Sequence, residues 1–303
     1  MILEKVSFIF VLIILGFVYC RITKGTQSDT NTLSKLVLNV SVPASIISSI
    51  TSANYEAVKE DLPVLLLAAT AISAVTLAVS FVLPPLLRVK TRAASAVYQS
   101  ALFFNNYGFM GWPVCQLLFG DQGMLYAALY SIPLHLLFYT ITPAMLNRGG
   151  NGKLFDRKVL VNLPLYATII GLMILMLRLQ LPDYVAQLCS VVGATQTPLS
   201  MMIVGMILAS ANLKEIIVGV RPYLFSLLRL LVLPAAVYLV LESLGLSGLL
   251  LGVPVMITAM PTGAMVVVLA QKYRADTLLT SRLIIISTLL SILTVPIIAM
   301  LVL

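Results

Sequence analysis

The chain has 303 residues, of which 60% are hydrophobic and 10% are charged, and its mean hydropathy is +1.05. Soluble domains hold roughly 45–50% apolar and about 25% charged residues, so this composition excludes a soluble protein and indicates an integral membrane protein. The formal net charge of +8 does not point to nucleic acid, because the basic residues lie in short connections between apolar spans.

Ten apolar stretches are predicted to cross the membrane, because about 20 apolar residues are needed to span the hydrocarbon. They cover approximately residues 3–20, 33–51, 62–87, 95–119, 122–146, 159–178, 184–210, 216–241, 249–270 and 279–303. The first stretch is interpreted as a membrane helix rather than a signal peptide. A signal peptide begins with a positively charged segment and ends at a small-residue cleavage site, whereas here Glu4 places a negative charge in the first segment and no such site follows. No soluble domain fits between the spans, so residues 1–303 are expected to form one membrane unit.

The positions of the basic residues predict the orientation. Of 19 lysines and arginines, fifteen lie in the connections that follow odd-numbered spans, three lie near the N-terminus or in the other connections, and Arg229 lies inside a span. Lys and Arg are retained on the cytoplasmic side. We therefore expect both termini to lie outside a cell (plasma or inner) membrane, and the regular alternation supports the count of ten.

The two halves of the chain resemble each other. At one offset, residues 33–45 match residues 188–200, with Leu33 over Leu188, Val37 over Val192, Pro43 over Pro198 and Ser45 over Ser200. Residues 1–146 and 159–303 would then be two repeats of five helices each. Because five is odd, the second repeat must be inverted relative to the first, as in many secondary transporters.

Residues 105–113, with the sequence NNYGFMGWP, interrupt the fourth apolar span. A similar offset lays residues 106–108 over residues 259–261 of the ninth span, so both spans are expected to be broken at equivalent depths. Irregular backbone within a membrane is tolerated only where protein or a water-filled cavity surrounds it, and helix N-termini attract anions. We expect two crossed, broken helices that form a binding site; the alternative is a pair of Gly/Pro kinks with a purely structural role.

Five motifs in the same order resemble the auxin efflux carrier family, which includes plant PIN-formed auxin transporters and bacterial organic-acid permeases. They are residues 42–45 (VPAS), 106–113 (NYGFMGWP), 138–140 (FYT), 197–201 (TPLSM) and 259–273 (AMPTGAMVVVLAQKY). The resemblance covers essentially the whole chain. Val266 stands where plant members have a proline, so the ninth-helix break is expected nearer Pro261 and Gly263. Only about a dozen residues connect helices five and six, which points to a microbial permease.

The resemblance implies an all-α membrane protein with ten helices in two inverted repeats and crossed, broken helices 4 and 9. Helices 1, 2, 6 and 7 would form a scaffold that mediates a homodimer. Helices 3–5 and 8–10 would form a transport bundle that moves by an elevator mechanism.

Candidate site residues are polar or backbone-breaking positions inside the spans. For substrate binding they are Asn105, Asn106, Tyr107, Gly108, Pro113, His135, Tyr139, Arg229, Thr258, Pro261, Thr262 and Gly263, with Tyr139 implied by the resemblance alone. His135 would bind a proton or carboxylate, or donate to a backbone carbonyl. Arg229 would neutralise an organic anion, or bind carbonyls between helices. Beside the prolines of helices two and seven lie Asn39, Ser41, Gln196 and Thr197, which would face the bundle or bond between helices.

The eleven acidic residues all lie in connections or near span ends. This distribution argues against a proton or sodium antiporter that depends on a buried carboxylate, but leaves open a sodium ion held by neutral oxygens. Cys20, Cys115 and Cys189 form no metal-ligand pattern, and we expect no metal, no cofactor and no enzymatic activity. The leading hypothesis is a carrier of small organic anions such as malate, malonate or auxin-like aromatic acids; the alternatives are an anion channel and a sodium-coupled organic-acid symporter.

Overall fold

The computed structural model describes residues 2–51, 53–146, 162–211, 216 and 218–303, and over these residues the chain is helical. The first half contains α1 (Ile2–Thr23), α2 (Gln27–Leu36), η1 (Val37–Ser41), α3 (Val42–Thr51), α4 (Tyr55–Leu86), α5 (Arg92–Phe103), η2 (Tyr107–Gly111) and α6 (Trp112–Leu146). The second half contains α7 (Leu163–Met176), α8 (Asp183–Ala194), α9 (Gln196–Ala209), α11 (Arg221–Leu227), η4 (Leu228–Val232), α12 (Leu233–Ser243), α13 (Gly248–Thr258), α14 (Met265–Lys272) and α15 (Thr277–Val302). The predicted basic connection at residues 147–158 lies outside the described residues.

Six helical segments of the described chain are long and apolar enough to cross a membrane: Gln27–Thr51, Tyr55–Leu86, Tyr107–Leu146, Asp183–Ala209, Arg221–Ser243 and Thr277–Val302. Shorter apolar helices lie at Ser7–Thr23, Leu163–Met176 and Gly248–Thr258. These segments confirm an all-helical membrane protein with several spans. The count of ten and the inverted repeat stay predictions, because the other four expected spans are short or interrupted.

Among the described residues, three π-helical segments each end two residues before a proline. Proline lacks a backbone N–H, so the regular bond to the carbonyl four residues earlier cannot form, and a wider turn with bonds five residues back takes its place. The first residue after η1, η2 and η4 makes such a bond, from Val42 to Val37, from Trp112 to Tyr107 and from Leu233 to Leu228. Pro43, Pro113 and Pro234 therefore widen three helices without ending them.

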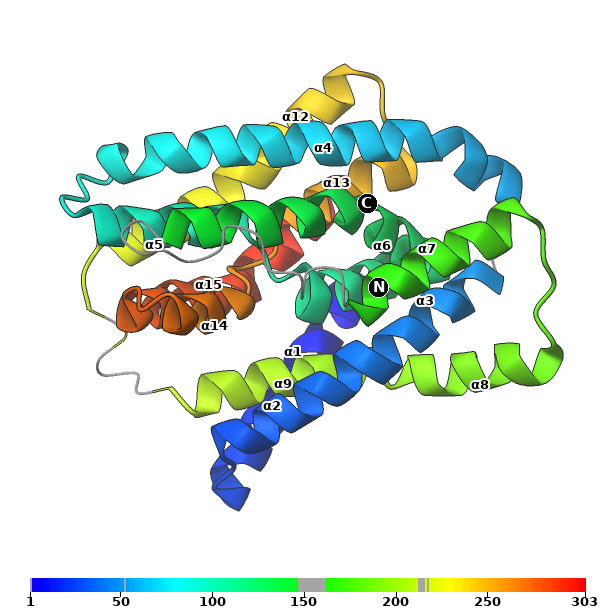
Figure 1. Cartoon of the computed structure of the whole chain (residues 1–303), viewed down its shortest axis with the longest axis horizontal. Coiled ribbons are helices and arrows are strands. Elements are labelled where there is room, and N and C mark those ends of the chain that lie inside the picture. Colours follow the sequence, from blue (N-terminus) through cyan, green and yellow to red (C-terminus); the bar gives the residue numbers. More distant parts are fainter. Residues whose placement is uncertain (1, 52, 147–161, 212–215, 217) are drawn as a thin grey trace.

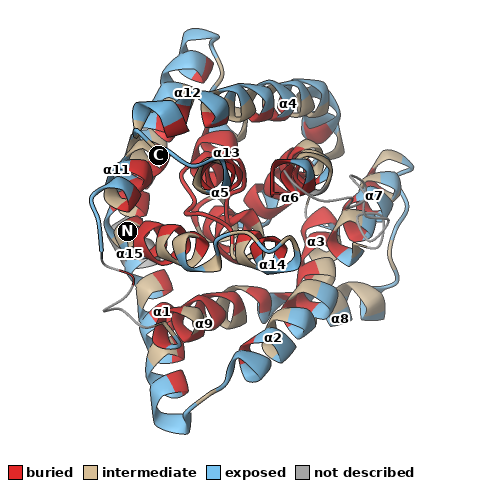
Figure 2. Ribbon diagram, turned by 60° about the vertical axis from the view of Figure 1, so that its left-hand side comes forward, coloured by how far each residue is buried: buried red, intermediate tan, exposed pale blue. Residues whose placement is uncertain are grey.

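The helices form two groups. In one, α1 packs along α9, and η1 and α3 pack against α7 and α8. The other group contains α4, α5, α6 and α11 to α15 (Figure 1). Its centre is formed by α13 and the C-terminal end of α5. The groups meet where α3 contacts α6, α9 contacts η2 and α1 contacts α15. Figure 2 shows that buried residues concentrate in the second group, along α5, α6 and α13.

Gly120 divides the long helix α6. Its φ of 71° and ψ of −161° are non-helical values inside the segment Trp112–Leu146, and this backbone region is strained for residues with a Cβ. The kink falls between the expected fourth and fifth spans, so residues 112–119 and 121–146 form separate helical segments. The first of these segments follows directly from η2 and belongs to the interrupted fourth span.

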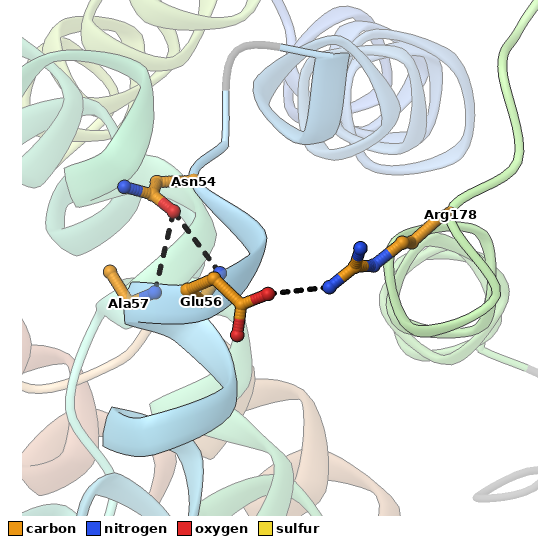
Figure 3. A network of polar contacts seen from close by, with 4 residues as sticks. All are labelled: Asn54, Glu56, Ala57 and Arg178. Atoms are coloured by element: carbon orange, nitrogen blue, oxygen red, sulfur yellow. Dashed lines mark hydrogen bonds and ion pairs between the residues drawn. The ribbon is translucent and has the colours of Figure 1, made fainter.

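A polar contact links the start of α4 to the end of α7. The side chain of Asn54 caps α4 by accepting from the backbone N–H of Glu56 at 3.1 Å and of Ala57 at 3.4 Å. Glu56 in turn accepts from Arg178, 2.5 Å away (Figure 3). The guanidinium also lies 4.0 Å from the centre of the Tyr55 ring. This exposed contact therefore joins the two groups of helices.

Candidate functional site

The two expected interruptions meet. Helix α5 ends at Phe103 and η2 begins at Tyr107, while α13 ends at Thr258 and α14 begins at Met265. Between these ends, Asn105 and Thr262 form an isolated antiparallel bridge. The interruption in the ninth span thus lies at residues 259–264, around Pro261 and Gly263, and Val266 is already in α14.

Two backbone hydrogen bonds hold the bridge together. The N–H of Asn106 donates to the carbonyl of Pro261 at 2.8 Å, and the N–H of Gly263 donates to the carbonyl of Phe104 at 3.1 Å. All four residues are buried. Unpaired backbone groups at such a place would be costly, so each interruption supplies the hydrogen-bond partners that the other lacks.

Polar side chains satisfy carbonyls in the last turns of α5 and α13, where no backbone N–H follows in the helix. Asn105 Nδ2 donates to the carbonyl of Ile257 at 2.7 Å. Thr262 Oγ1 donates to the carbonyl of Ala101 at 3.2 Å, and Arg229 Nη1 donates to the carbonyl of Leu102. The N–H of Thr262 donates to Ser287 Oγ of α15 at 3.1 Å. Three expected site residues, Asn105, Thr262 and Arg229, therefore stabilise the broken backbone.

Gly263 is required for the close approach of the two segments. A Cβ at this position would lie 2.5 Å from ring atoms of Phe104 and 2.8 Å from the carbonyl oxygen of Asn105. By contrast, a Cβ at Gly108 would meet only the Leu38 side chain, at 3.9 Å. The two glycines thus differ in role: Gly263 lets the bridge form, while Gly108 faces η1 of the other helix group.

The N-terminal ends of two helical segments begin beside the bridge. Asn106 precedes η2 and Ala264 precedes α14, and neither makes a side-chain capping bond. N–H groups at such ends and the helix dipole favour a negative charge. Within the described part of the chain the Asn106 side chain has no hydrogen-bond partner, and it is buried to 7% exposure. The hydrogen-bonding groups of this amide are therefore not used within the described residues.

Tyr107 and His135 form a pair on one side of the bridge. The Tyr107 hydroxyl lies 2.5 Å from His135 Nδ1, and both side chains line a pocket with Trp112, Ser131, Asn162 and Thr168. Trp112 is fixed by its Nε1, which donates to the carbonyl of Ala127 at 3.2 Å and to Ser131 Oγ at 3.0 Å. The pocket lies between α6 and α7, where the two helix groups meet.

A second pocket lies inside the α4–α6 and α11–α15 group. Asn105, Arg229 and Thr258 line it, together with Ser73, Thr76, Tyr130 and apolar side chains. Its α6 residues, Tyr130 and Leu134, point from a different helix face than Ser131 and His135 of the first pocket. Five of the expected site residues are thus divided between two pockets beside the bridge, and Asn106 lines neither of them.

The remaining expected residues have different surroundings. Pro113 is buried in the first turn of α6, beyond the interruption, and the side chain of Tyr139 lies outside the described residues. Ser41 Oγ lies 2.8 Å from Thr195 Oγ1, while Thr197 donates to Gln116 at 3.3 Å and Gln196 Nε2 contacts Met124 Sδ at 4.0 Å. Asn39 is exposed. Ser41 therefore bonds between η1 and the start of α9, and Gln196 and Thr197 reach across to α6.

Sequence reasoning missed Ser73, Thr76, Tyr130 and Ser287. Each is one of several uncharged polar residues in an apolar span, and such residues most often form bonds between helices. The polarity of these residues inside an apolar span is the one sequence feature that could have indicated a functional role. It does not indicate which pocket each side chain lines.

Comparison with known proteins matches residues 1–299 to the model of a family described as membrane transport protein. The chain is 25% identical over 297 residues to an uncharacterized transporter of Methanothermobacter thermautotrophicus, covering 97% of this chain and 96% of that protein. It is 26% identical over 202 residues to an uncharacterized transporter of Methanocaldococcus jannaschii, covering 63% of each.

Proposed function

Because this chain belongs to the membrane transport protein family, the auxin efflux carrier family that its motifs resemble, we propose that it is a secondary carrier of small organic anions. The observation that carries the proposal is the buried bridge between Asn105 and Thr262. It joins interrupted helices from the two halves of the chain, and transporters of inverted-repeat design place their substrates at such discontinuous helices.

The substrate carboxylate is proposed to bind at the start of η2. There the free side chain of Asn106, the helix N-terminus and the Tyr107–His135 pair offer hydrogen-bond donors without a fixed counter-charge. An amide can donate to a carboxylate through its NH₂ group. The free space beside Tyr107 and His135 measures only about 10 Å³, so its apolar walls and Trp112 must move apart to admit the carbon skeleton of a small or aromatic acid.

The proposed architecture has ten spans in two inverted repeats, with residues 95–119 and 249–270 as the crossed, broken helices 4 and 9. The group that contains α1, α3, α7, α8 and α9 serves as the scaffold of a homodimer, and the group around α13 serves as the transport bundle. Separate packing of these groups (Figure 1) supports a movement of one past the other. The termini lie outside the cell membrane in this arrangement.

Flux through the purified protein in liposomes tests the proposal. Labelled malate, malonate or an indole acid should enter with saturation, and unlabelled acid inside should accelerate that entry by counterflow. Asn106→Ala should abolish the flux, and Asn31→Ala, at an exposed position, should preserve it. Unitary currents in a planar bilayer would instead identify a channel, and flux that requires a sodium gradient would identify the symporter. Uptake of none of these acids would reject the proposed substrate class.

A further inference from the structure

Arg229 is an unusual residue in this fold. Among the side chains that the structure describes, it is the only Lys, Arg, Asp or Glu that is buried, with 2% exposure. No ion pair of Arg229 occurs in the described part of the chain, and the pocket around it has no acidic lining residue. A buried charge without a counter-charge costs several kcal/mol.

The surroundings satisfy only part of the guanidinium. Nη1 donates to the carbonyl of Leu102, and the C-terminal end of α5 carries a partial negative charge that favours a cation. However, Nε of Arg229 has no partner within the described residues. One strong donor is therefore left over, and roughly half a unit of positive charge remains uncompensated.

The free space beside Arg229 is small and polar on one side. It measures about 20 Å³, which exceeds the roughly 10–15 Å³ that one water molecule needs. Ser73, Thr76 and Thr258 bring hydroxyl groups to its wall. Asn105 Oδ1, which belongs to another residue lining this pocket, likewise has no partner among the described residues.

We propose that this pocket binds a small inorganic anion, of which chloride is the simplest example. The anion serves as the counter-ion of Arg229. The ion accepts from Arg229 Nε and from the hydroxyl groups of the wall. It stabilises the end of α5, and with it the bridge, but is not the transported substrate, which binds in the Tyr107–His135 pocket of the proposed function.

Thermal unfolding of the purified protein tests the assignment. In sodium gluconate at constant ionic strength, replacing gluconate by chloride should raise the unfolding temperature with saturation, by about 2–4 °C, because a ligand that binds only the folded state stabilises it. Arg229→Gln should lose this response. Arg221→Gln, which removes an exposed cation from the same helical segment, should keep it.

A second variant keeps the test valid if Arg229→Gln does not fold. Ser73→Asp adds a fixed carboxylate to the pocket wall, so it should be at least as stable as the wild type in gluconate and should not respond to chloride. The proposal is overturned if the wild type shows no chloride-specific shift, or if Arg229→Gln or Ser73→Asp responds like the wild type. It is also overturned if malate competes with chloride, since the pocket would then be the substrate site; loss of transport alone would reject only the proposed function.

Discussion

The backbone N–H of Asn106 donates to the carbonyl of Pro261 at 2.8 Å, so the two interruptions are joined through main-chain atoms. This bond does not depend on the side chain of Asn106. In contrast, the side chain of Asn105 donates to the carbonyl of Ile257 at 2.7 Å. The side chain of Asn105 therefore serves the fold, whereas the side chain of Asn106 is the one proposed to contact the ligand.

Alanine substitutions should separate these roles. Asn105→Ala leaves a buried carbonyl without its donor, which costs about 1–3 kcal/mol, and should lower the thermal unfolding temperature. Asn106→Ala should change the free energy of unfolding by less than about 1 kcal/mol, while it abolishes organic-anion flux. Equal destabilisation by the two variants, measured in the same detergent, would contradict this assignment.

Gly263→Ala should disrupt the bridge. Its Cβ meets the Phe104 ring at 2.5 Å and the Asn105 carbonyl at 2.8 Å, and overpacking of this kind costs about 1–3 kcal/mol. Gly108→Ala is the matched control, because its Cβ has only an ordinary contact with Leu38 at 3.9 Å. The unfolding temperatures of both variants check the prediction, and a tolerated Gly263→Ala would refute the close approach of the two segments.

The Tyr107–His135 contact should be measurable as a coupling energy. A double-mutant cycle with Tyr107→Phe and His135→Gln is expected to give about 0.5–3 kcal/mol, the usual range for residues in direct contact. Both single variants should also raise the KM for the transported acid, because the pair lines the proposed substrate pocket. Additive effects on stability would show that the two side chains do not interact.

The exposed Glu56–Arg178 pair is expected to matter for movement more than for stability. Pairs of this kind contribute about 0–1 kcal/mol, so Glu56→Gln should leave the unfolding temperature nearly unchanged. The pair joins α4 to the end of α7 (Figure 3), across the two helix groups.

Cross-linking gives the measurement. In a variant without Cys20, Cys115 and Cys189, cysteines at positions 56 and 178 joined by a reducible reagent should stop flux until the link is reduced. A control pair within one group, at positions 238 and 242, which lie one turn apart on α12, should not. Full flux in the cross-linked protein would contradict relative movement of the groups at this contact.

The interruptions were predictable because Asn, Gly and Pro are poor residues for a helix in hydrocarbon, and residues 104–106 and 259–264 carry them. The apolar runs likewise predicted the described long helices. What sequence did not reveal is the pairing itself: backbone carbonyls such as those of Leu102 and Ile257 have no sequence signature, so the acceptors of Arg229 and Asn105 were not foreseeable.

The division of the site into two pockets was also not predictable. Tyr107, His135 and Arg229 were all expected in one site, but which face of α6 or η4 a side chain takes depends on three-dimensional packing. The π-helical turns add to this difficulty, since each shifts the faces of the helix that follows it.

The most direct test of the central claim, that the transported anion binds beside the bridged interruptions at the start of η2, is an experimental structure with a bromine-labelled carboxylate that the protein transports. The account predicts an anomalous peak beside Asn106 and Tyr107, at the start of η2. A peak elsewhere in the protein, or helices that run through residues 104–106 and 259–264 without interruption, would contradict it.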